Sequence, residues 1–436
     1  MISVLVLYLR CVFAANFSSK NSDFEIAGRK LTGRTYFYPE KAYSNLLLLV
    51  STFFQVAKQL NKTTVLEQLA NSGIYIYDTN TKSKTQRIEY VEFFSGEKIE
   101  GLFSRNDVFT TQSFFKKLWI LLGCFLITIV FLPLTVLSKT LRKKYSLLPL
   151  EYASSVALKY LVADNKIKKV HFFSAYERDV CINSLLLKKI NVYTNIITSE
   201  VPLFLWNELL IANSISICFK YQQEEVAFFD KTIKYEKLNY WAPEIYLEIR
   251  KIYADNSEKK YKSKLGFYST AGWLRKKLGH LDNKKDEFEI KVLDALMEVC
   301  KRNKMPLLIF LHPLEKKHKE ETNAYYSSFN YQNISYADES KSNIELFYQA
   351  ELVVTFFSAI AFERLFYGHK TLLFPINRYP NFPIKMSPFN SICINDLESL
   401  ELSISKAFNV STSAFFQENG IEDYTIRKHP ILSVNP

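Results

Sequence analysis

The chain has 436 residues, of which 48% are hydrophobic and 15% aromatic, enough apolar material for two ordinary domains; this excludes a largely disordered protein. Its 56 lysines and arginines against 44 acidic residues leave a net charge of +12, which favours a phosphorylated ligand or an anionic membrane surface as partner. Glycine is scarce, at 11 residues, and neither G-x-G-x-x-G nor G-x-x-x-x-G-K-[ST] occurs. The sequence therefore disfavours glycine-fingerprint dinucleotide enzymes and P-loop ATPases.

Basic residues and cysteines narrow the partners and the compartment. The lysines and arginines are dispersed, and no zinc finger, RNP motif or basic zipper accompanies them. Nucleic acid is therefore not an expected partner. The six cysteines form no C-x-x-C pair, and several lie within apolar runs, which favours a reducing compartment.

The first predicted domain comprises residues 1–255. It opens with an apolar run at 2–9 that has no basic residue before it and is too short to cross a membrane. We interpret this run as a first β-strand and not as a signal peptide. Further strands are predicted at 73–77, 87–93, 170–174, 192–197 and 215–219, and helices at 43–60, 64–70, 150–161, 178–188 and 202–211. Strands and helices alternate in the second half of this domain, which predicts a parallel sheet.

A hydrophobic segment interrupts the first domain at residues 118–137. It contains no charged side chain, and basic residues flank it on both sides. Its length suffices to cross a bilayer. Three interpretations stay open: a membrane span, a shallow insertion bent at Pro133 with the flanking basic residues on anionic head groups, and a fully buried core helix. The shallow insertion is preferred, because a span would separate the strands before the segment from those after it.

A polar, basic stretch at 255–264 is interpreted as the linker to a second domain, residues 256–415, which is followed by a C-terminal tail, 416–436. Strands are predicted at 264–268, 306–311, 333–336, 352–355 and 371–374, and helices at 286–302, 343–350 and 359–367. This alternation predicts a second parallel sheet, whose loops share one edge. Ligands of open α/β sheets bind at the carboxyl ends of the strands.

Hydroxyl and imidazole side chains follow three of these strands. Ser269 and Thr270 precede a helix, a layout in which helix amides bind phosphate. Pro313 ends the next strand and fixes His312 at its rim, where the ring can donate to a phosphate oxygen; a surface histidine is the alternative. Ser358 begins a later helix, where its hydroxyl binds phosphate, caps the helix, or does both.

Three charged residues could complete a nucleotide site. Arg275, on the helix after Thr270, would stabilise a leaving phosphate or lie on a solvated helix face. Glu363 would accept a hydrogen bond from a ribose hydroxyl or pair with Arg364. Asp338 would contact the nucleotide or form a turn.

Residues 350–363 (AELVVTFFSAIAFE) and 368–375 (GHKTLLFP) resemble the donor-nucleotide half of GT-B glycosyltransferases. The His312-Pro313 pair is similar to the His-Pro motif of bacterial sialyltransferases, Kdo transferases and CDP-glycerol-type transferases. The resemblance covers about residues 264–376 and implies that His312 and Ser358 contact the phosphates of the donor. At the next position the chain has Ala359, where those families carry a second hydroxyl residue.

The resemblance implies a GT-B-like α/β fold, with two Rossmann-like parallel-sheet domains facing a cleft. The apolar segment at 118–137 adds a membrane-associating part to the first domain. The resemblance also implies transfer without a bound metal or other cofactor, and no D-x-D stands at a predicted strand end. An inverting transfer needs a general base for the acceptor hydroxyl. Glu200 and Glu177, each after a predicted strand of the first domain, are the candidates; either could instead be a favourable acid at a helix N-terminus.

The expected function is transfer of a sugar from a nucleotide-activated donor to a lipid-linked or polysaccharide acceptor in the synthesis of a surface glycan such as O antigen or capsule. The expected location is the cytoplasmic face of the inner membrane, with the cytoplasm as the alternative. Two other functions stay open: a CDP-polyol phosphotransferase of similar fold and a non-catalytic, membrane-associated scaffold.

Overall fold

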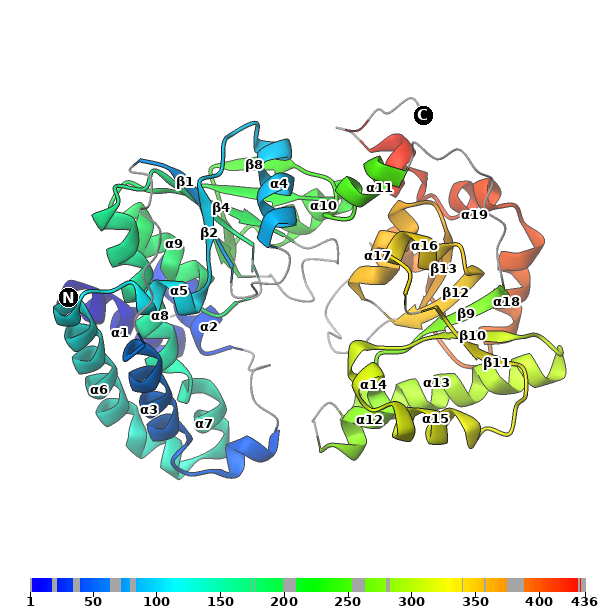
Figure 1. Cartoon of the computed structure of the whole chain (residues 1–436), viewed down its shortest axis with the longest axis horizontal. Coiled ribbons are helices and arrows are strands. Elements are labelled where there is room, and N and C mark those ends of the chain that lie inside the picture. Colours follow the sequence, from blue (N-terminus) through cyan, green and yellow to red (C-terminus); the bar gives the residue numbers. More distant parts are fainter. Residues whose placement is uncertain are drawn as a thin grey trace. The chain divides into compact units, whose positions relative to one another are not determined.

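The computed structural model divides into two compact units (Figure 1). The first comprises Met1–Cys218 and Gln222–Trp241, and the second Phe219–Tyr221 and Ala242–Pro436. The structure describes residues 2–17, 22–33, 40–62, 72–78, 84–173, 175, 177–198, 209–252, 263–279, 283–338, 340–356, 358–374, 388–429 and 432. Most of the predicted linker, 255–264, lies outside these residues.

The first unit is built on a six-stranded parallel sheet with the order β2-β1-β3-β4-β6-β8. The strands are β1 (Ile74–Tyr77), β2 (Gly101–Phe103), β3 (Lys169–Phe172), β4 (Tyr193–Ile197), β6 (Ser214–Ile217) and β8 (Lys237–Tyr240). A two-stranded ribbon pairs β5 (Leu210–Ile211) with β7 (Ile233–Lys234). The direction in which strands are added reverses between β1 and β3, which makes that pair the switch point of the sheet.

Helices cover both faces of this sheet (Figure 1): α4 (Lys84–Ser95) lies on one side, and α8 (Leu148–Asp164), α9 (Val180–Lys188) and α10 (Lys220–Phe228) lie on the other. The expected strand at 87–93 is wrong, because these residues belong to α4. Tyr90 contacts Phe94 one helical turn later, at 5.0 Å between ring centroids, and Trp241 at 5.8 Å. Aromatic residues are common in strands, which is why the sequence predicts a strand here. In the structure the same residues pack α4 against the sheet.

The N-terminal run is also a helix, α1 (Ile2–Phe17), and the predicted first strand is wrong. Val4, Leu7, Tyr8, Cys11 and Val12 are buried, at spacings of three and four. The buried residues follow a helical period that continues past Arg10. The predicted strand covers only residues 2–9, which are nearly all apolar and therefore show no period. Helix α2 (Asp23–Leu31) packs on α1.

The remaining predictions for the first unit differ in smaller ways. The helix expected at 43–60 is divided into η1 (Glu40–Ser44) and α3 (Leu48–Leu60). The helix expected at 64–70 lies outside the described residues, as does most of the one expected at 202–211, whose described end is strand β5. The strands predicted at 73–77, 170–174, 192–197 and 215–219 correspond to β1, β3, β4 and β6, and the helices at 150–161 and 178–188 to α8 and α9.

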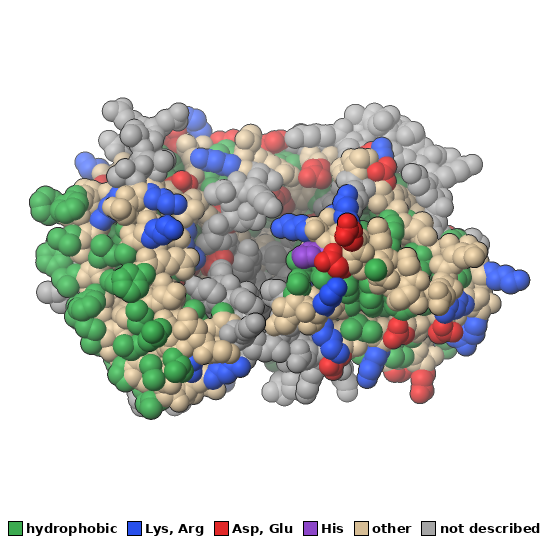
Figure 2. All heavy atoms as spheres, turned by 60° about the horizontal axis from the view of Figure 1, so that its bottom comes forward, with side chains coloured by type: hydrophobic (Ala, Val, Ile, Leu, Met, Phe, Trp, Pro, Cys, Tyr) green, Lys and Arg blue, Asp and Glu red, His purple; other side chains and the backbone are tan. Residues whose placement is uncertain are grey.

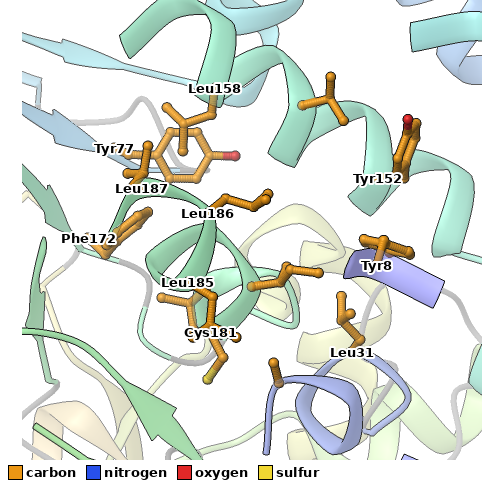
Figure 3. Packing of buried hydrophobic residues seen from close by; sticks show 14 of the residues in the cluster. Tyr8, Leu31, Tyr77, Tyr152, Leu158, Phe172, Cys181, Leu185, Leu186 and Leu187 are labelled. Carbon is orange, nitrogen blue, oxygen red and sulfur yellow. The ribbon is translucent and has the colours of Figure 1, made fainter. Parts of the chain in front are cut away.

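The hydrophobic segment forms helix α6 (Phe114–Leu137), between α5 (Arg105–Thr110) and α7 (Lys139–Tyr145). One face packs on α8 and α3; Gly123 allows this approach, because a Cβ there would lie 2.3 Å from the Tyr152 ring. Tyr152 in turn meets Tyr8 edge to face at 5.4 Å. Figure 3 shows these rings in one core with side chains of α9 and the sheet. The other face of α6 is exposed, so the fully buried interpretation is wrong.

The second unit has a five-stranded parallel sheet with the order β11-β10-β9-β12-β13. The strands are β9 (Ser263–Tyr268), β10 (Leu307–Phe310), β11 (Ile334–Tyr336), β12 (Ala350–Phe356) and β13 (Lys370–Phe374). All five predicted strands are confirmed. In chain order this is the Rossmann arrangement 3-2-1-4-5, whose switch point lies between β9 and β12.

The helices of the second unit are α11 (Tyr246–Ile252), α12 (Gly272–Lys277), α13 (Asn283–Arg302), α14 (Pro313–Lys317), α15 (Lys319–Ser327), α16 (Asn343–Phe347), α17 (Ala359–Phe366), α18 (Leu400–Asn409) and α19 (Thr412–Glu418), with 3-10 turns η4 (Pro388–Ile392), η5 (Glu422–Tyr424) and η6 (Ile426–Lys428). Helices α13 and α15 lie on one side of the sheet and α16 and α17 on the other (Figure 1). Ile421 is fully buried, so the described part of the predicted tail packs into this unit.

The α/β fold class is confirmed at the level of the units: each is a Rossmann-like parallel sheet with helices on both faces, and the first carries an apolar helical segment. Each fold follows from short, mostly apolar strands that alternate with helices along the chain.

Candidate functional site

The candidate site is the carboxyl edge of the second sheet. Phe310 of β10 and Thr355 of β12 both pair with Tyr268 of β9, so the three strands end at the same level. Tyr268 and Phe310 are in ring contact at 4.3 Å, and Ile360, in the first turn of α17, packs on the same apolar cluster. The loops after β9, β10 and β12 therefore share one edge, at the switch point of the sheet.

The loop after β9 binds a carboxylate of the protein itself. Glu289, on α13, accepts hydrogen bonds from the backbone N–H of Thr270 at 2.6 Å and of Gly272 at 3.0 Å, and from the hydroxyl of Thr270. The Ser269 hydroxyl lies 3.4 Å from the same carboxylate and accepts from the Ala271 N–H. Both predicted phosphate ligands, Ser269 and Thr270, are thus buried and occupied by Glu289.

Backbone geometry fits this loop to the carboxylate. Ala271, which precedes α12, has a left-handed φ of 59°, a conformation that costs a residue with a Cβ about 1 kcal/mol. Gly272 follows, and a Cβ there would lie 2.5 Å from Glu289 Oε2. Glycine at this position is what lets the carboxylate approach the amides.

Arg275, the predicted partner of a leaving phosphate, is engaged within its own unit. Its Nε lies 3.4 Å from Asp286 Oδ1, on α13, and the side chain is partly exposed. This pair joins α12 to α13 beside the Glu289 contact. The structure therefore gives Arg275 a packing role at the base of the loop.

His312 caps α14. Its Nδ1 accepts a hydrogen bond from the Leu314 N–H at 3.1 Å, and its own N–H donates to Glu315 Oε2 at 2.9 Å, a reciprocal capping box that Pro313 starts. Because Nδ1 is an acceptor here, a neutral ring carries its proton on Nε2. His312 is half-buried at the strand rim, and its cap uses Nδ1 and not Nε2.

Glu315, the other half of the His312 cap, is itself held by hydrogen bonds. It is fully buried, and its Oε1 accepts from Trp273 Nε1 at 2.7 Å and from the Tyr326 hydroxyl at 3.1 Å. Burial raises the pKa of Glu315, and the hydrogen bonds from His312 and Trp273 oppose that rise. The Trp273 ring stacks on Tyr325 with centroids 4.2 Å apart. The cap of α14 is thereby held rigidly against α12 and α15.

Ser358 begins α17 in extended backbone geometry, with its carbonyl accepting from the Ala361 N–H at 3.1 Å. Among the described residues, its hydroxyl makes no capping bond, and the buried Oγ has no hydrogen-bond partner. The first amides of a helix have no acceptor within the helix and attract anions. Within the described part of the chain, the Ser358 hydroxyl is therefore the predicted phosphate ligand that no other group of the protein occupies.

The two acidic residues predicted to contact the nucleotide, Glu363 and Asp338, have different surroundings. Glu363 lies within electrostatic reach of Tyr268: burial raises the pKa of Tyr268 to about 12, Arg364 opposes the rise, and Glu363 adds to it. Glu363 thus belongs to the same edge as Ser358. Asp338 is exposed and forms a turn, accepting from the N–H of Ser340 at 3.1 Å and from its hydroxyl at 2.7 Å.

Of the two predicted bases, Glu200 lies outside the described residues. Glu177 follows β3, at the switch point of the first sheet, where it is buried and lies 3.6 Å from Arg105 Nη2. Asp179 is 3.5 Å from the same nitrogen, and the two carboxylates raise the pKa of Arg105 against the effect of burial. Glu177 is therefore a member of a buried ionic cluster.

A second buried ion pair supports this region. Arg178 Nε lies 3.0 Å from Glu151 Oε1, on α8, and the guanidinium also donates to the carbonyls of Leu31 and Lys144. Arg178 thus joins α2, α7 and α8. Burial raises the pKa of Glu151 to about 7, and the charge of Arg178 opposes that rise.

Sequence reasoning missed Glu289, Glu315, Arg105 and Asp179. A signal existed for Glu315, since His-Pro-x-Glu has the spacing of a capping box. Glu289 had none, because the loop that it binds is 17 to 20 residues away in the chain. Among the described residues, no group of three or more His, Cys, Asp or Glu side chains is placed to hold a metal ion.

No protein-family model and no curated protein matches the sequence. The chain is similar to the solved structure of UDP-N-acetylglucosamine 2-epimerase from Rickettsia bellii at 9% identity and a TM-score of 0.47, covering 81% of this chain and 94% of that one. It is similar to UDP-GlcNAc 2-epimerase from Neisseria meningitidis, bound to UDP-GlcNAc, at 9% identity and 0.46, covering 80% and 94%. MurG from Acinetobacter baumannii gives 11% and 0.34, covering 79% and 88%. At such values these similarities assign no residue role and no activity.

Proposed function

We propose that the second unit binds the phosphates of a nucleotide-activated sugar and that the chain is a glycosyltransferase. One observation carries this proposal: the Ser358 hydroxyl, at the start of α17, has no hydrogen-bond partner among the described residues and lies on the same sheet edge as His312. Strands β10 and β12 flank β9, so the two loops lie about 10 Å apart. An extended diphosphate ligand suits that spacing better than a single phosphate ion.

The proposed chemistry is the attack of an acceptor hydroxyl on the anomeric carbon of the donor. The bond from that carbon to the phosphate oxygen breaks, the nucleotide leaves with the electron pair, and the hydroxyl proton passes to a general base. His312 and the amides of α17 would stabilise the charge on the leaving phosphate, so no metal is required for this role. Glu177 and Glu200 remain the candidate bases.

The finer assignments remain proposals of the same kind. The donor group would be that of the His-Pro transferases, and the acceptor a lipid-linked or polysaccharide chain of a surface glycan, modified at the cytoplasmic face of the membrane. A CDP-polyol phosphotransferase is the second candidate, because His312 would serve its pyrophosphate equally well. The two differ in the donor from which the enzyme releases nucleotide.

The test is binding and turnover with CMP, CDP, UDP, GDP, their sugars and a CDP-polyol, measured by calorimetry and nucleotide release. His312→Asn keeps a side-chain acceptor for the Leu314 N–H but is too short to place an N–H where Nε2 of the histidine lies. We expect it to weaken nucleotide binding by about tenfold or more, the value of a hydrogen bond to a charged group. Ser358→Ala should weaken binding about threefold to tenfold.

His318→Asn, at the exposed start of α15, is the matched control and should bind as the wild type does. Unchanged affinity in His312→Asn would contradict the proposed site. Binding without nucleotide release from any donor would favour the scaffold interpretation over an enzyme.

A further inference from the structure

Helix α6 leaves an apolar face uncovered on the first unit. Twelve of its large hydrophobic side chains are exposed, among them Phe125 at 48%, Ile129 at 53% and Leu137 at 79%. They make up more than half of the exposed large hydrophobic residues in the described part of the chain. At 100° per residue they fall on one half of the helix surface. Monomeric proteins rarely leave such a patch to water.

Neighbouring helices extend this outer face of α6. Phe53 of α3 contacts Phe125 with ring centroids 6.2 Å apart, and Phe54 beside it is exposed. Phe13 of α1 is exposed as well, but its ring stacks on Phe131, which belongs to the buried face of α6. Figure 2 shows hydrophobic side chains gathered over this part of the first unit, with lysines and arginines beside them. The apolar surface of α6 therefore continues onto α3.

The opposite face of α6 is locked into the unit. Ile120, Cys124, Ile127 and Phe131 are at most 1% exposed, and Gly123 brings the helix against the Tyr152 ring. By length and composition α6 could cross a bilayer. A crossing would also draw in α8, which leads directly to β3 and carries the buried charge pair Glu151–Arg178. The packing thus favours contact along one face over a span.

A proline supports the same geometry. Pro133 is exposed on the outer face and has no N–H, so the Ile129 carbonyl loses its usual helical donor. A backbone carbonyl without a donor is costly in hydrocarbon but can bond water or a head group at the interface. The outer face is therefore suited to the boundary of a membrane.

Charge decides between a membrane and a second copy of the chain. Helices α1, α3, α6 and α7 contain eight basic residues and no acidic one. Lys117 and Arg142 are buried, and Lys116 pairs with Asp164. The other five are at least partly exposed: Arg10, Lys58, Lys139, Lys143 and Lys144. Pairing two copies through this face would bring basic borders together, which is repulsive. Anionic lipid head groups complement the same border.

We infer that the outer face of α6, with the exposed ring of Phe54 on α3, docks on an anionic lipid bilayer, with α6 lying in the interface. This inference does not rest on the proposed function. Apolar side chains enter the head-group boundary, and the lysines of α3 and α7 bind anionic lipid.

The experiment is sedimentation of the full chain with vesicles of phosphatidylcholine alone or with 30% phosphatidylglycerol, a composition chosen for the test. The triple variant Leu122→Gln, Phe125→Gln, Ile129→Gln changes only exposed side chains of α6. We expect the wild type to bind the anionic vesicles, less so at high salt, and the variant to bind at least about tenfold more weakly.

The matched control is the triple variant Phe228→Gln, Leu278→Gln, Leu402→Gln. It changes three exposed hydrophobic residues that lie outside α1, α3, α6 and α7, and it should bind vesicles as the wild type does. Circular dichroism melts should agree among the three proteins. Equal vesicle binding by wild type and α6 variant would overturn the inference. So would a dimer, seen by light scattering, that the α6 variant abolishes while the wild type ignores vesicles, because a second copy would then be the occupant.

Discussion

Thr270 and Glu289 are joined by two hydrogen bonds: the Thr270 N–H donates to Oε1 at 2.6 Å, and its hydroxyl donates to Oε2. A carboxylate of the protein thus lies where the loop after β9 was expected to hold a phosphate. The loop is a structural joint between β9, α12 and α13. In the proposed function, the contacts to a donor phosphate therefore come from His312 and Ser358.

Glu289→Ala should destabilise the protein by about 2–4 kcal/mol, because two backbone N–H groups and a hydroxyl would lose a buried charged acceptor. The measurement is the free energy of unfolding in urea. Glu287→Ala, two residues earlier on α13 and exposed, should change the free energy of unfolding by less than about 0.5 kcal/mol. Equal stability of the two variants would show that the loop does not depend on Glu289.

Gly272→Ala should also destabilise, by about 1–3 kcal/mol, since its Cβ would lie 2.5 Å from Glu289 Oε2 and displace the carboxylate. The sharper test is a double-mutant cycle with Glu289→Ala. Once the carboxylate is gone, most of the glycine penalty should disappear. Additive losses would mean that the methyl group clashes with the α13 backbone near Asp286 and not with Glu289.

Glu151→Gln should alter how stability depends on pH. Burial raises the pKa of Glu151 from an ordinary 4.5 to about 7, so the native state binds more protons than the unfolded state between these values. The stability that this group contributes is therefore complete below about pH 4.5 and is lost as pH rises through 7. Glutamine keeps an acceptor for Arg178 but cannot ionise.

We therefore expect the urea midpoint of Glu151→Gln, relative to the wild type, to increase as pH rises from 5 to 8, with Glu320→Gln, an exposed site, as control. A difference between variant and wild type that stays constant over this range would show that Glu151 remains ionised in the folded protein.

Arg105→Met should cost about 3–5 kcal/mol of stability, because it leaves the buried carboxylates of Glu177 and Asp179 without their shared cation. Arg29→Met removes an exposed arginine 4.0 Å from Glu25 and should have little effect. Chemical denaturation of both variants is the measurement. A stable Arg105→Met would imply that the two acids are neutralised by something other than this guanidinium.

The sequence by itself determined the second sheet and the position of His312 at its rim. Strands β9 to β13 are short, apolar and bounded by polar residues, and His312-Pro313 lies at a strand end, so local pattern located these elements within a few residues. It failed for α1 and α4, because a short run of apolar and aromatic residues fits both a buried strand and one face of a helix. Only its packing partners select between them.

Tertiary structure alone decided which polar groups are occupied. Glu289 reaches Thr270 because α13 folds back beside β9, and Arg105 meets Asp179 because β2 and β3 flank β1; neither pairing has a signal in nearby sequence. The exposure of α6 was decided in the same way, since composition shows that a helix is apolar but not which half of it α8 covers. Contacts between residues far apart in the chain depend on how the elements assemble, and a local sequence pattern does not encode that assembly.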